Sequence, residues 1–406
     1  MGVSILRTYD VIIIGGGIVG LSTAMKMSSE YPNLDIAVIE KEDGFAEHQT
    51  GHNSGVIHAG IYYKPGSKKG NFCYAGNKEL RKYCDIKGIE YELCGKLIVA
   101  TDIKELEMLK DLHSRGVANG VDGLKMIDKN EIKDIEPHAS GLGALHSPNT
   151  GIVDYKLVAK AYAEDAEQQG VDLFTSCKFL GYKFQNGKTY LNTTDGDFET
   201  EWTINCAGLY ADKIANKMDV SSDTRIIPFR GEFFSIIPEK SSMIKGLIYP
   251  VPQPELPFLG VHFTKRVDGT IEAGPNAVLA FARQGYKKTD FSMADLFEYL
   301  RFPGFWRMSA THWKTGIDEQ YRSLFKKVFA KSLQKLVPDI KEEDLSNPSA
   351  GVRAQAVSFK GEIVQDFKIL SGPKSIHVLN APSPAATASL IIGEEIVQNA
   401  KSNFDI

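Results

Sequence analysis

The chain has 406 residues, of which 43% are hydrophobic, so it can bury a large core and is predicted to form two domains. A formal net charge of −4 provides no overall attraction to nucleic acid or anionic membranes, although it leaves room for a local basic patch. The five cysteines, an odd number without CxxC spacing, argue against a disulfide framework and a zinc site. We therefore expect a cytoplasmic protein with no metal and no nucleic-acid partner.

The first motif is a glycine-rich turn between a strand and a helix. The apolar run Asp10–Ile14 predicts a buried parallel strand, Gly15, Gly17 and Gly20 follow it, and Leu21–Ser29 has helical composition. In such a turn the first glycine permits the tight bend and the second lets the backbone approach a pyrophosphate. The third lets the helix pack closely on the strand. The motif therefore predicts dinucleotide binding.

A second strand, residues 35–40, ends in an acid 20 residues after Gly20. The carboxylate of this residue, Glu40, is placed to accept hydrogen bonds from ribose hydroxyls and would repel a 2′-phosphate, which argues against NADP. The apolar run before Gly15 is too short for a signal peptide. No stretch of about 18 apolar residues exists, so no helix is predicted to span a membrane.

The loop that follows is rich in histidine and tyrosine. Residues 50–66 read TGHNSGVIHAGIYYKPG and place His52, His58, Tyr62, Tyr63 and Lys64 within 13 residues. Because the loop begins soon after the first βαβ unit, its backbone is expected to return toward the cofactor. An ordinary surface loop is the alternative interpretation.

The middle of the chain alternates helices and strands. The expected elements are helices over 71–87 and 104–119, a strand over 91–101, a helix opened by Gly151–Tyr155 and running to Gln169, and strands over 173–184 and 188–194. Residues 201–212 read EWTINCAGLYAD, a strand, a small-residue turn and a helix. Gly208 in this turn would let the backbone approach the cofactor from a second direction. A plain strand–helix joint fits the spacing equally well.

The composition changes after residue 226. Up to residue 282, short strands separated by Pro and Gly predict a mostly antiparallel sheet. Residues 283–335 are predicted to be helical and basic, with 11 Lys and Arg against 5 Asp and Glu. The interleaved aromatic residues are Phe291, Phe297, Tyr299, Phe302, Phe305, Trp306 and Trp313. This composition suits a peripheral contact with the inner face of the cell membrane. A solvated helical cap with its aromatic residues in a core is the alternative.

The C-terminal part returns to α/β character. A strand pair is predicted around 361–370 and a further strand over 376–380. Residues 381–389 then lead into a last helix that ends at Ala400. Pro384 is expected in the first turn of that helix, where the small residues after it would expose N–H donors.

Taken in order, these motifs resemble the flavin-dependent oxidoreductases of the D-amino-acid oxidase superfamily. Within it, the chain resembles the L-2-hydroxyglutarate dehydrogenases, also called oxidases, along nearly its whole length. The stretches that carry the resemblance are GGGIVGLSTA at 15–24, HNSGVIHAGIYYKPGS at 52–67, NCAGLYAD at 205–212, PFRGEFF at 228–234, LPFLGVHFT at 256–264, GPNAVLAFARQGY at 274–286, AGVRAQA at 350–356 and NAPSPAATAS at 380–389. The first marks only dinucleotide binding, whereas the later ones are specific to the subfamily.

The resemblance implies an α/β fold with a discontinuous Rossmann-like FAD-binding domain and an α+β substrate domain whose sheet is mostly antiparallel. The FAD-binding domain is expected from residues 1–95, 151–225 and 346–406. The substrate domain is expected from 96–150 and 226–345, including the basic helical cap.

The implied activity is FAD-dependent oxidation of L-2-hydroxyglutarate, a small dicarboxylate, to 2-oxoglutarate. Hydride would pass to flavin N5, and the electrons would then pass to an acceptor, either a quinone chain or oxygen. One alternative is oxidation of another small hydroxy acid, glycerol 3-phosphate or an amino acid on the same fold. A protein that binds FAD without turnover is an alternative of a different class.

Two histidines are candidates for the base that takes the hydroxyl proton. His262 lies in the expected substrate sheet, and His58 lies in the loop that returns toward the flavin. In related superfamily members, a histidine matching His58 carries the flavin covalently, so a tether is its rival role. A core histidine bonded to backbone is the structural alternative for both.

Cations are expected to hold the substrate carboxylates. Arg353, preceded by Gly351, is the first candidate, because a guanidinium grips a carboxylate through two parallel hydrogen bonds. Arg230 would bind the distal carboxylate or would instead pair with Glu232. Tyr62 and Lys64 would assist.

The expected FAD contacts combine the motifs with the family resemblance. They are Gly15, Gly17, Ile18, Gly20, Glu40, Lys41, Asn53, Ser54, His58, Lys178, Ala207, Gly208, Pro384, Ala385, Ala386 and Thr387. The segment from Pro384 to Ala386, at a helix start, would present the backbone N–H groups of Ala385 and Ala386, which would stabilise the negative charge that develops near flavin N1.

Overall fold

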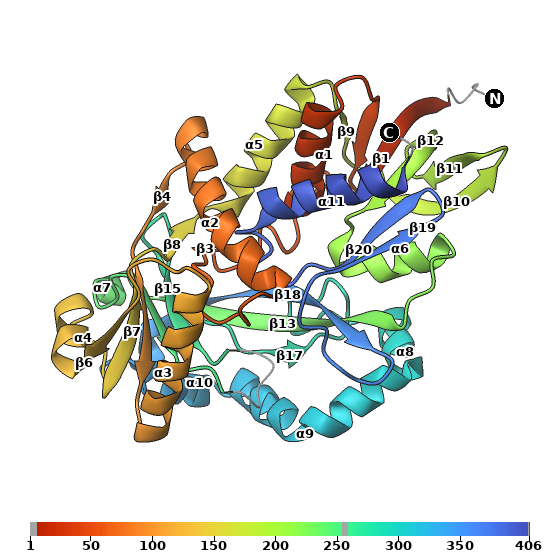
Figure 1. The fold of residues 1–406 in the computed structure, drawn as a ribbon. Helices are drawn as coiled ribbons and strands as arrows, with labels where there is room; N and C mark the ends of the chain where they lie inside the picture. Colours follow the sequence, from red (N-terminus) through yellow and green to blue (C-terminus); the bar gives the residue numbers. More distant parts are fainter. Residues whose placement is uncertain (1–5, 254–258, 405) are drawn as a thin grey trace. The chain divides into compact units, whose positions relative to one another are not determined.

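The computed structural model describes residues 6–253, 259–404 and 406, and the chain divides into two compact units (Figure 1). Unit 1 comprises Met1–His52, Tyr155–Ile227 and Ala354–Ile406, and unit 2 comprises Asn53–Asp154 and Pro228–Arg353. Residues 53–95 belong to unit 2 and not to the unit that contains the N-terminal glycine turn, which differs from the expected domain boundaries. The reason is strand pairing, because two short strands of this segment pair with a strand at 151–153.

Unit 1 is built on an eight-stranded sheet with a parallel centre. Its strands are β1 (Arg7–Ile14), β2 (Ile36–Ile39), β9 (Asp172–Phe174), β10 (Phe179–Gln185), β11 (Lys188–Thr193), β12 (Gly196–Asn205), β19 (Lys368–Gly372) and β20 (Ser375–Asn380). β1 lies between β2 and β12, and all three run parallel. All of β2 and the second half of β1 are buried, as expected for the apolar runs of a parallel sheet.

Helices cover this sheet. They are α1 (Ile18–Glu30), α5 (Tyr155–Gln168), α6 (Ala211–Lys217) and α11 (Ser389–Asn403), with a short 3₁₀ turn, η1 (Gly208–Tyr210), before α6. α1 packs against both α5 and α11 (Figure 1). The Ser22 hydroxyl of α1 donates to the Ser389 carbonyl at 2.8 Å, at the start of α11. Most residues of α1 are therefore buried, in keeping with its largely apolar sequence.

Unit 2 contains most of a nine-stranded sheet. The strands are β5 (Lys96–Ala100), β6 (Lys125–Asp128), β7 (Gly143–Ser147), β13 (Thr224–Ile236), β14 (Leu247–Pro250), β15 (His262–Lys265), β16 (Ile271–Gly274), β17 (Val278–Leu279) and β18 (Leu345–Ser358). β5 and β14 run parallel, whereas β13 to β17 otherwise pair in antiparallel fashion. The expected mostly antiparallel sheet is confirmed, and with it the α/β fold class.

A smaller sheet in unit 2 joins β3 (Val56–Ile57), β8 (Gly151–Val153) and β4 (Tyr91–Glu92). The sequence predicted that Gly151–Tyr155 would open a helix, and this was wrong for its first residues. They form β8, and α5 begins at Tyr155. Ile152 is fully enclosed between strands of this sheet, and such pairing outweighs weak local helical preference.

Alternate residues of β5 enter two different cores. Leu97 and Val99 pack into one hydrophobic cluster, and Ile98 and Ala100 pack into another. Side chains of a strand alternate between the two faces of its sheet, so Lys96 shares the face of Ile98. This alternation carries a lysine into the interior of unit 2.

The remaining helices belong to unit 2. They are α2 (Lys68–Lys87), α3 (Ile103–Ala118), α4 (Lys129–Ile135), α7 (Pro238–Ser241), α8 (Met293–Arg301), α9 (Pro303–Leu324) and α10 (Lys326–Leu333), with a 3₁₀ turn, η2 (Glu342–Asp344). The predicted helical basic region is thus confirmed from Met293 onward. Within the ranges that the structure describes, no helix combines the length and apolar composition that a membrane span requires.

Candidate active site

The glycine turn of unit 1 has the geometry that its sequence predicted. Gly15 has a φ of +114°, a conformation that L side chains rarely adopt. A Cβ on Gly20 would lie 2.0 Å from the Gly15 carbonyl oxygen, so helix and turn meet only because this residue lacks a side chain. Gly17 is the N-cap of α1, and a Cβ added at this position would approach only the Thr50 hydroxyl, at 3.4 Å. The space before the helix is therefore open to a ligand phosphate, as dinucleotide binding requires.

Glu40 lies directly after β2 and is 8% exposed. One carboxylate oxygen accepts the Gly16 N–H at 2.7 Å, and the other accepts the Glu42 N–H at 3.0 Å. Each oxygen has a second lone pair, so these bonds fix the carboxylate while leaving acceptor capacity for ribose hydroxyls. Its neighbour Lys41 forms an ion pair with Glu42 and lies 5.3 Å from the ring centroid of Tyr210.

Three further predicted FAD contacts in unit 1 have structural partners. Ala207 donates its N–H to the Asn205 side chain at 3.1 Å, Gly208 begins η1, and the Thr387 hydroxyl hydrogen-bonds to Tyr155 at 2.9 Å. Lys178 is exposed and pairs through its backbone with Thr194. Asn53, Ser54 and His58 belong to unit 2. Sequence reasoning missed Thr50, whose hydroxyl accepts the Ile18 N–H at 3.0 Å.

The predicted helix start at Pro384 was wrong. α11 begins at Ser389, and residues 383–388 form turns before it. The Ala385 N–H donates to the Pro382 carbonyl at 3.0 Å, so this donor is already engaged. A residue that precedes a proline is disfavoured in the α conformation, and two prolines close together delay the helix until they have passed.

In unit 2, His262 on β15 faces Tyr249 on β14. The register pairs Leu247 with Thr264 and Ile248 with Phe263, so the next pair is Tyr249 with His262. The two rings stack with centroids 3.7 Å apart. His262 Nδ1 lies 2.9 Å from the Gly260 carbonyl oxygen, which can only accept. Nδ1 therefore carries the proton, and Nε2 of the neutral ring presents a lone pair.

The two candidate histidines belong to one electrostatic cluster within unit 2. Burial, together with the positive charges of Lys96 and Arg353, lowers the pKa of His262 to about 3. Burial also holds the pKa of His58 well below its ordinary value, with smaller effects from Lys96 and His262. Both imidazoles are therefore neutral at pH 7 and able to accept a proton. The structure thus brings together the three residues predicted to be catalytic.

Arg353 is fixed at the edge of this cluster. It lies on β18 and is half-buried, and its Nη1 donates to the Asn276 carbonyl at 3.2 Å. Burial lowers the pKa of Arg353 to about 10, opposed by the charge of Glu319, so the guanidinium stays cationic at pH 7. It can therefore bind an anion beside His262.

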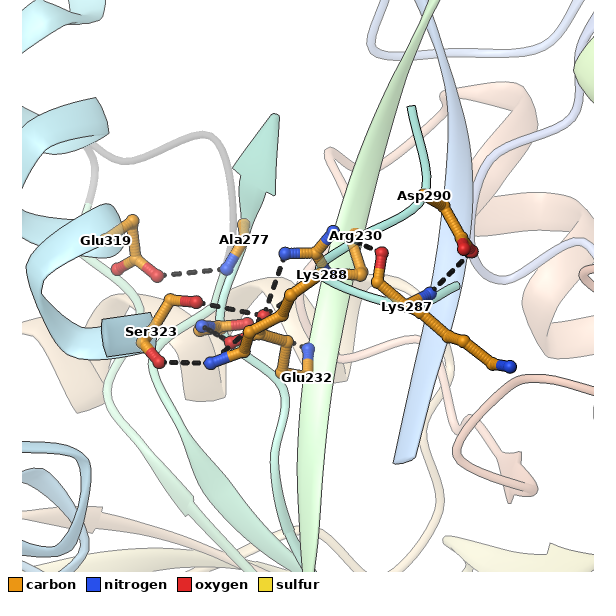
Figure 2. A network of polar contacts seen from close by, with 9 residues as sticks. Arg230, Glu232, Ala277, Lys287, Lys288, Asp290, Glu319 and Ser323 are labelled. Carbon is orange, nitrogen blue, oxygen red and sulfur yellow. Dashed lines mark hydrogen bonds and ion pairs between the residues drawn. The ribbon is translucent and has the colours of Figure 1, made fainter. Parts of the chain in front are cut away.

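Arg230 is committed to an internal partner (Figure 2). Glu232 Oε1 accepts from Arg230 Nε at 3.2 Å and from Nη2 at 3.0 Å, and both residues are buried. The same carboxylate also accepts from the Ser323 hydroxyl at 2.9 Å and the Asn276 side-chain amide at 2.9 Å. Figure 2 shows Arg230 and Ser323 directed toward Glu232. The pairing of Arg230 with Glu232 is the structural alternative that the sequence left open.

The two assisting residues have different environments. Lys64 is exposed. The hydroxyl of Tyr62 is buried and has no hydrogen-bond partner among residues 6–253, 259–404 and 406, and the ring centroid of Tyr62 lies 5.3 Å from Lys96 Nζ. Sequence reasoning missed Lys96, which is 2% exposed and whose pKa is lowered by burial to about 7. In the motif LPFLGVHFT, residues 256–258 lie outside the described part of the chain.

Comparison with known proteins shows the family to which the chain belongs. A family model described as FAD dependent oxidoreductase matches residues 10–399. The L-2-hydroxyglutarate dehydrogenase of Indibacter alkaliphilus is 49% identical, over 98% of this chain and 100% of that protein. The mitochondrial L-2-hydroxyglutarate dehydrogenase of Homo sapiens is 43% identical, over 98% of this chain and 90% of that protein. Among solved structures, an L-alpha-glycerophosphate oxidase from Mycoplasma pneumoniae with FAD bound gives a TM-score of 0.80 at 24% identity, covering 97% of this chain and 94% of that one.

Proposed function

This chain belongs to the L-2-hydroxyglutarate dehydrogenases, a family of FAD-dependent oxidoreductases, and from that premise we propose that it oxidises L-2-hydroxyglutarate to 2-oxoglutarate. Beyond family membership, the proposal rests on one observation in unit 2: a neutral imidazole lies close to two basic side chains. His262 presents an unprotonated Nε2, and Arg353 and Lys96 act on the same ring. A 2-hydroxy acid needs a proton acceptor for its hydroxyl and a cation for its carboxylate.

FAD is the cofactor, and the glycine turn of unit 1 fits it. Gly15, Gly17 and the N-terminus of α1 would hold the pyrophosphate, and Glu40 would hold the ribose. When bound, FAD supplies the hydride acceptor for the reaction.

The protein itself supplies proton transfer and substrate orientation. His262 Nε2 takes the hydroxyl proton, while the Gly260 carbonyl holds Nδ1–H and so fixes both tautomer and ring orientation. The imidazolium that forms is disfavoured in the free protein by burial and by two nearby cations. A bound carboxylate offsets those cations, so substrate binding raises the pKa of His262 toward the range in which it works as a base.

Arg353 holds the carboxylate next to the reacting carbon. Its Nη1 donates to the Asn276 carbonyl, which fixes the guanidinium beside His262, and a guanidinium binds a carboxylate through paired hydrogen bonds. His58, close enough for its pKa to respond to His262, is the second candidate base or the site of a covalent flavin link.

The reduced enzyme must pass its electrons to an acceptor, and we propose a quinone chain or oxygen. A quinone is favoured by apolar side chains on the surface of α9. Trp306, Trp313 and Ile317 are 56%, 56% and 59% exposed, and Leu324 further along is 69% exposed. The basic residues Arg307 and Lys314 adjoin the two tryptophans. Exposed aromatic and basic residues on α9 suit the surface of an anionic bilayer. The apolar interior of such a bilayer dissolves quinones.

A steady-state assay tests the substrate. Purified holoenzyme would be given a panel of L-2-hydroxyglutarate, other 2-hydroxy acids, glycerol 3-phosphate and amino acids with an artificial electron acceptor. The proposal predicts the highest kcat/KM for L-2-hydroxyglutarate. A higher value for glycerol 3-phosphate or an amino acid would overturn it, and so would the absence of turnover with all of them.

A further inference from the structure

Lys96 is a buried lysine in unit 2. It begins β5, where it is flanked by β14 on one side and β7 on the other. Its Nζ lies 4.2 Å from the ring centroid of Tyr249 and 5.3 Å from that of Tyr62. Among the residues that the structure describes, no carboxylate pairs with this ammonium and no side chain accepts a hydrogen bond from it. Burial of an unpaired charge is costly, and an anion that enters the site would offset that cost.

The other cations of the cluster account for only one carboxylate of a dicarboxylate. Arg230 is occupied by Glu232, and Lys64 is exposed. Lys69, whose charge also acts on His58, lies 5.7 Å from the ring centroid of Tyr63. Arg353 binds one carboxylate under the proposed function. Lys96 and Arg353 both act on His262, so the imidazole lies within reach of two positive charges.

We propose that Lys96 binds the second, distal carboxylate of the dicarboxylate substrate, the role that the sequence had suggested for Arg230. This inference rests on the proposed function for the identity of the substrate, but the site itself requires only a dicarboxylate of matching length. Tyr62 completes the site, because its buried hydroxyl has no hydrogen-bond partner in the described part of the chain and can donate to the same carboxylate.

Binding at Lys96 should be linked to proton uptake. The groups that face the ammonium are Cys73, Cys94, Tyr62, Tyr249, His58 and His262. None of these is anionic at pH 7, since burial raises the pKa of both thiols and both phenols and the imidazoles are neutral. With a pKa of about 7, Lys96 is partly deprotonated at neutral pH and binds an anion only when protonated. Affinity for a dicarboxylate should therefore fall as the pH rises through 7.

Calorimetric titration of the holoenzyme with glutarate and with butyrate tests the role. Glutarate has both carboxylates but no oxidisable hydroxyl, and butyrate lacks the second carboxylate. Lys96→Met should weaken glutarate binding about 10- to 100-fold, the scale of a lost charge-assisted hydrogen bond, with little change for butyrate. Lys96→Arg should recover part of the loss. Lys125→Met, an exposed lysine on β6 of the same sheet, should bind both ligands as wild type does.

Proton uptake gives a second readout. Titrations at pH 7.5 in buffers of different ionisation enthalpy should show wild type taking up a proton with glutarate, and Lys96→Met should show none. Equal weakening of both ligands, or unchanged glutarate binding, in Lys96→Met would overturn the assignment. If Lys96→Met fails to fold, the same titrations with Lys96→Gln test whether Lys96 binds the distal carboxylate. Suppose that Lys96→Met loses its selectivity for glutarate but the wild-type enzyme does not oxidise L-2-hydroxyglutarate. That result would reject the proposed function and would still support the dicarboxylate site.

Discussion

Replacing His262 removes the proposed base, and His262→Asn does so with the least disturbance. The asparagine amide can still donate to the Gly260 carbonyl, which His262 Nδ1 meets at 2.9 Å, but it places no acceptor where Nε2 lay. His262→Ala would instead leave a gap beside Tyr249, whose ring stacks on the imidazole at 3.7 Å. Loss of a positioned base should slow flavin reduction ~10²–10⁴-fold, or ~3–5 kcal/mol in activation free energy.

Anaerobic stopped-flow measurement of flavin absorbance with L-2-hydroxyglutarate gives that rate directly. We expect His262→Asn to keep its flavin spectrum and most of its substrate affinity while losing the rate. The base works deprotonated and its pKa in the free protein is about 3, so its own protonation should reduce kcat/KM only under strongly acidic conditions. Near-normal reduction in His262→Asn, with a large loss in His58→Ala, would show that His58 is the base.

Three further predictions concern carboxylate binding, the cofactor and the membrane. Arg353→Ala should lose ~1.5–3 kcal/mol of substrate binding while keeping FAD, and Arg353→Lys should recover only part of it, as measured by kcat/KM; an unchanged value would exclude the role. Gly17→Leu should yield colourless protein on purification, because a side chain there blocks the approach of the pyrophosphate to the backbone; retained flavin would contradict that geometry. Trp306→Ser with Trp313→Ser should reduce co-flotation with anionic vesicles, whereas Ile86→Ser, at a residue 71% exposed on α2, should not; equal flotation of both variants would exclude α9.

The sequence predicted those features that depend on local geometry. The bend at Gly15 and the close approach at Gly20 follow from residue type and spacing, and the structure shows a positive φ at the first and no room for a Cβ at the second. The pairing of Arg230 with Glu232 was one of two open interpretations. It was foreseeable because residues two apart on a strand share a face.

Features that depend on tertiary pairing were missed. Lys96 begins an apolar strand, KLIVA, where a terminal lysine would ordinarily reach solvent. Its burial depends on pairing with β14 and β7 and on the rings of Tyr249 and Tyr62 beside its ammonium. Thr50 lies 32 residues from Ile18, whose N–H it accepts, so no local pattern links them. The start of α11 was misplaced because Pro384 was taken as part of its first turn, whereas a proline restricts the residue that precedes it and α11 begins at Ser389.

The central claim is that this protein oxidises one enantiomer of 2-hydroxyglutarate with its own flavin. The most direct measurement is to add each enantiomer anaerobically to the purified yellow protein and record the flavin spectrum. We expect complete bleaching by L-2-hydroxyglutarate, with 2-oxoglutarate formed in equal amount to the flavin, and no change with the D enantiomer. A spectrum that neither enantiomer bleaches, or that D-2-hydroxyglutarate bleaches as fast, would contradict it.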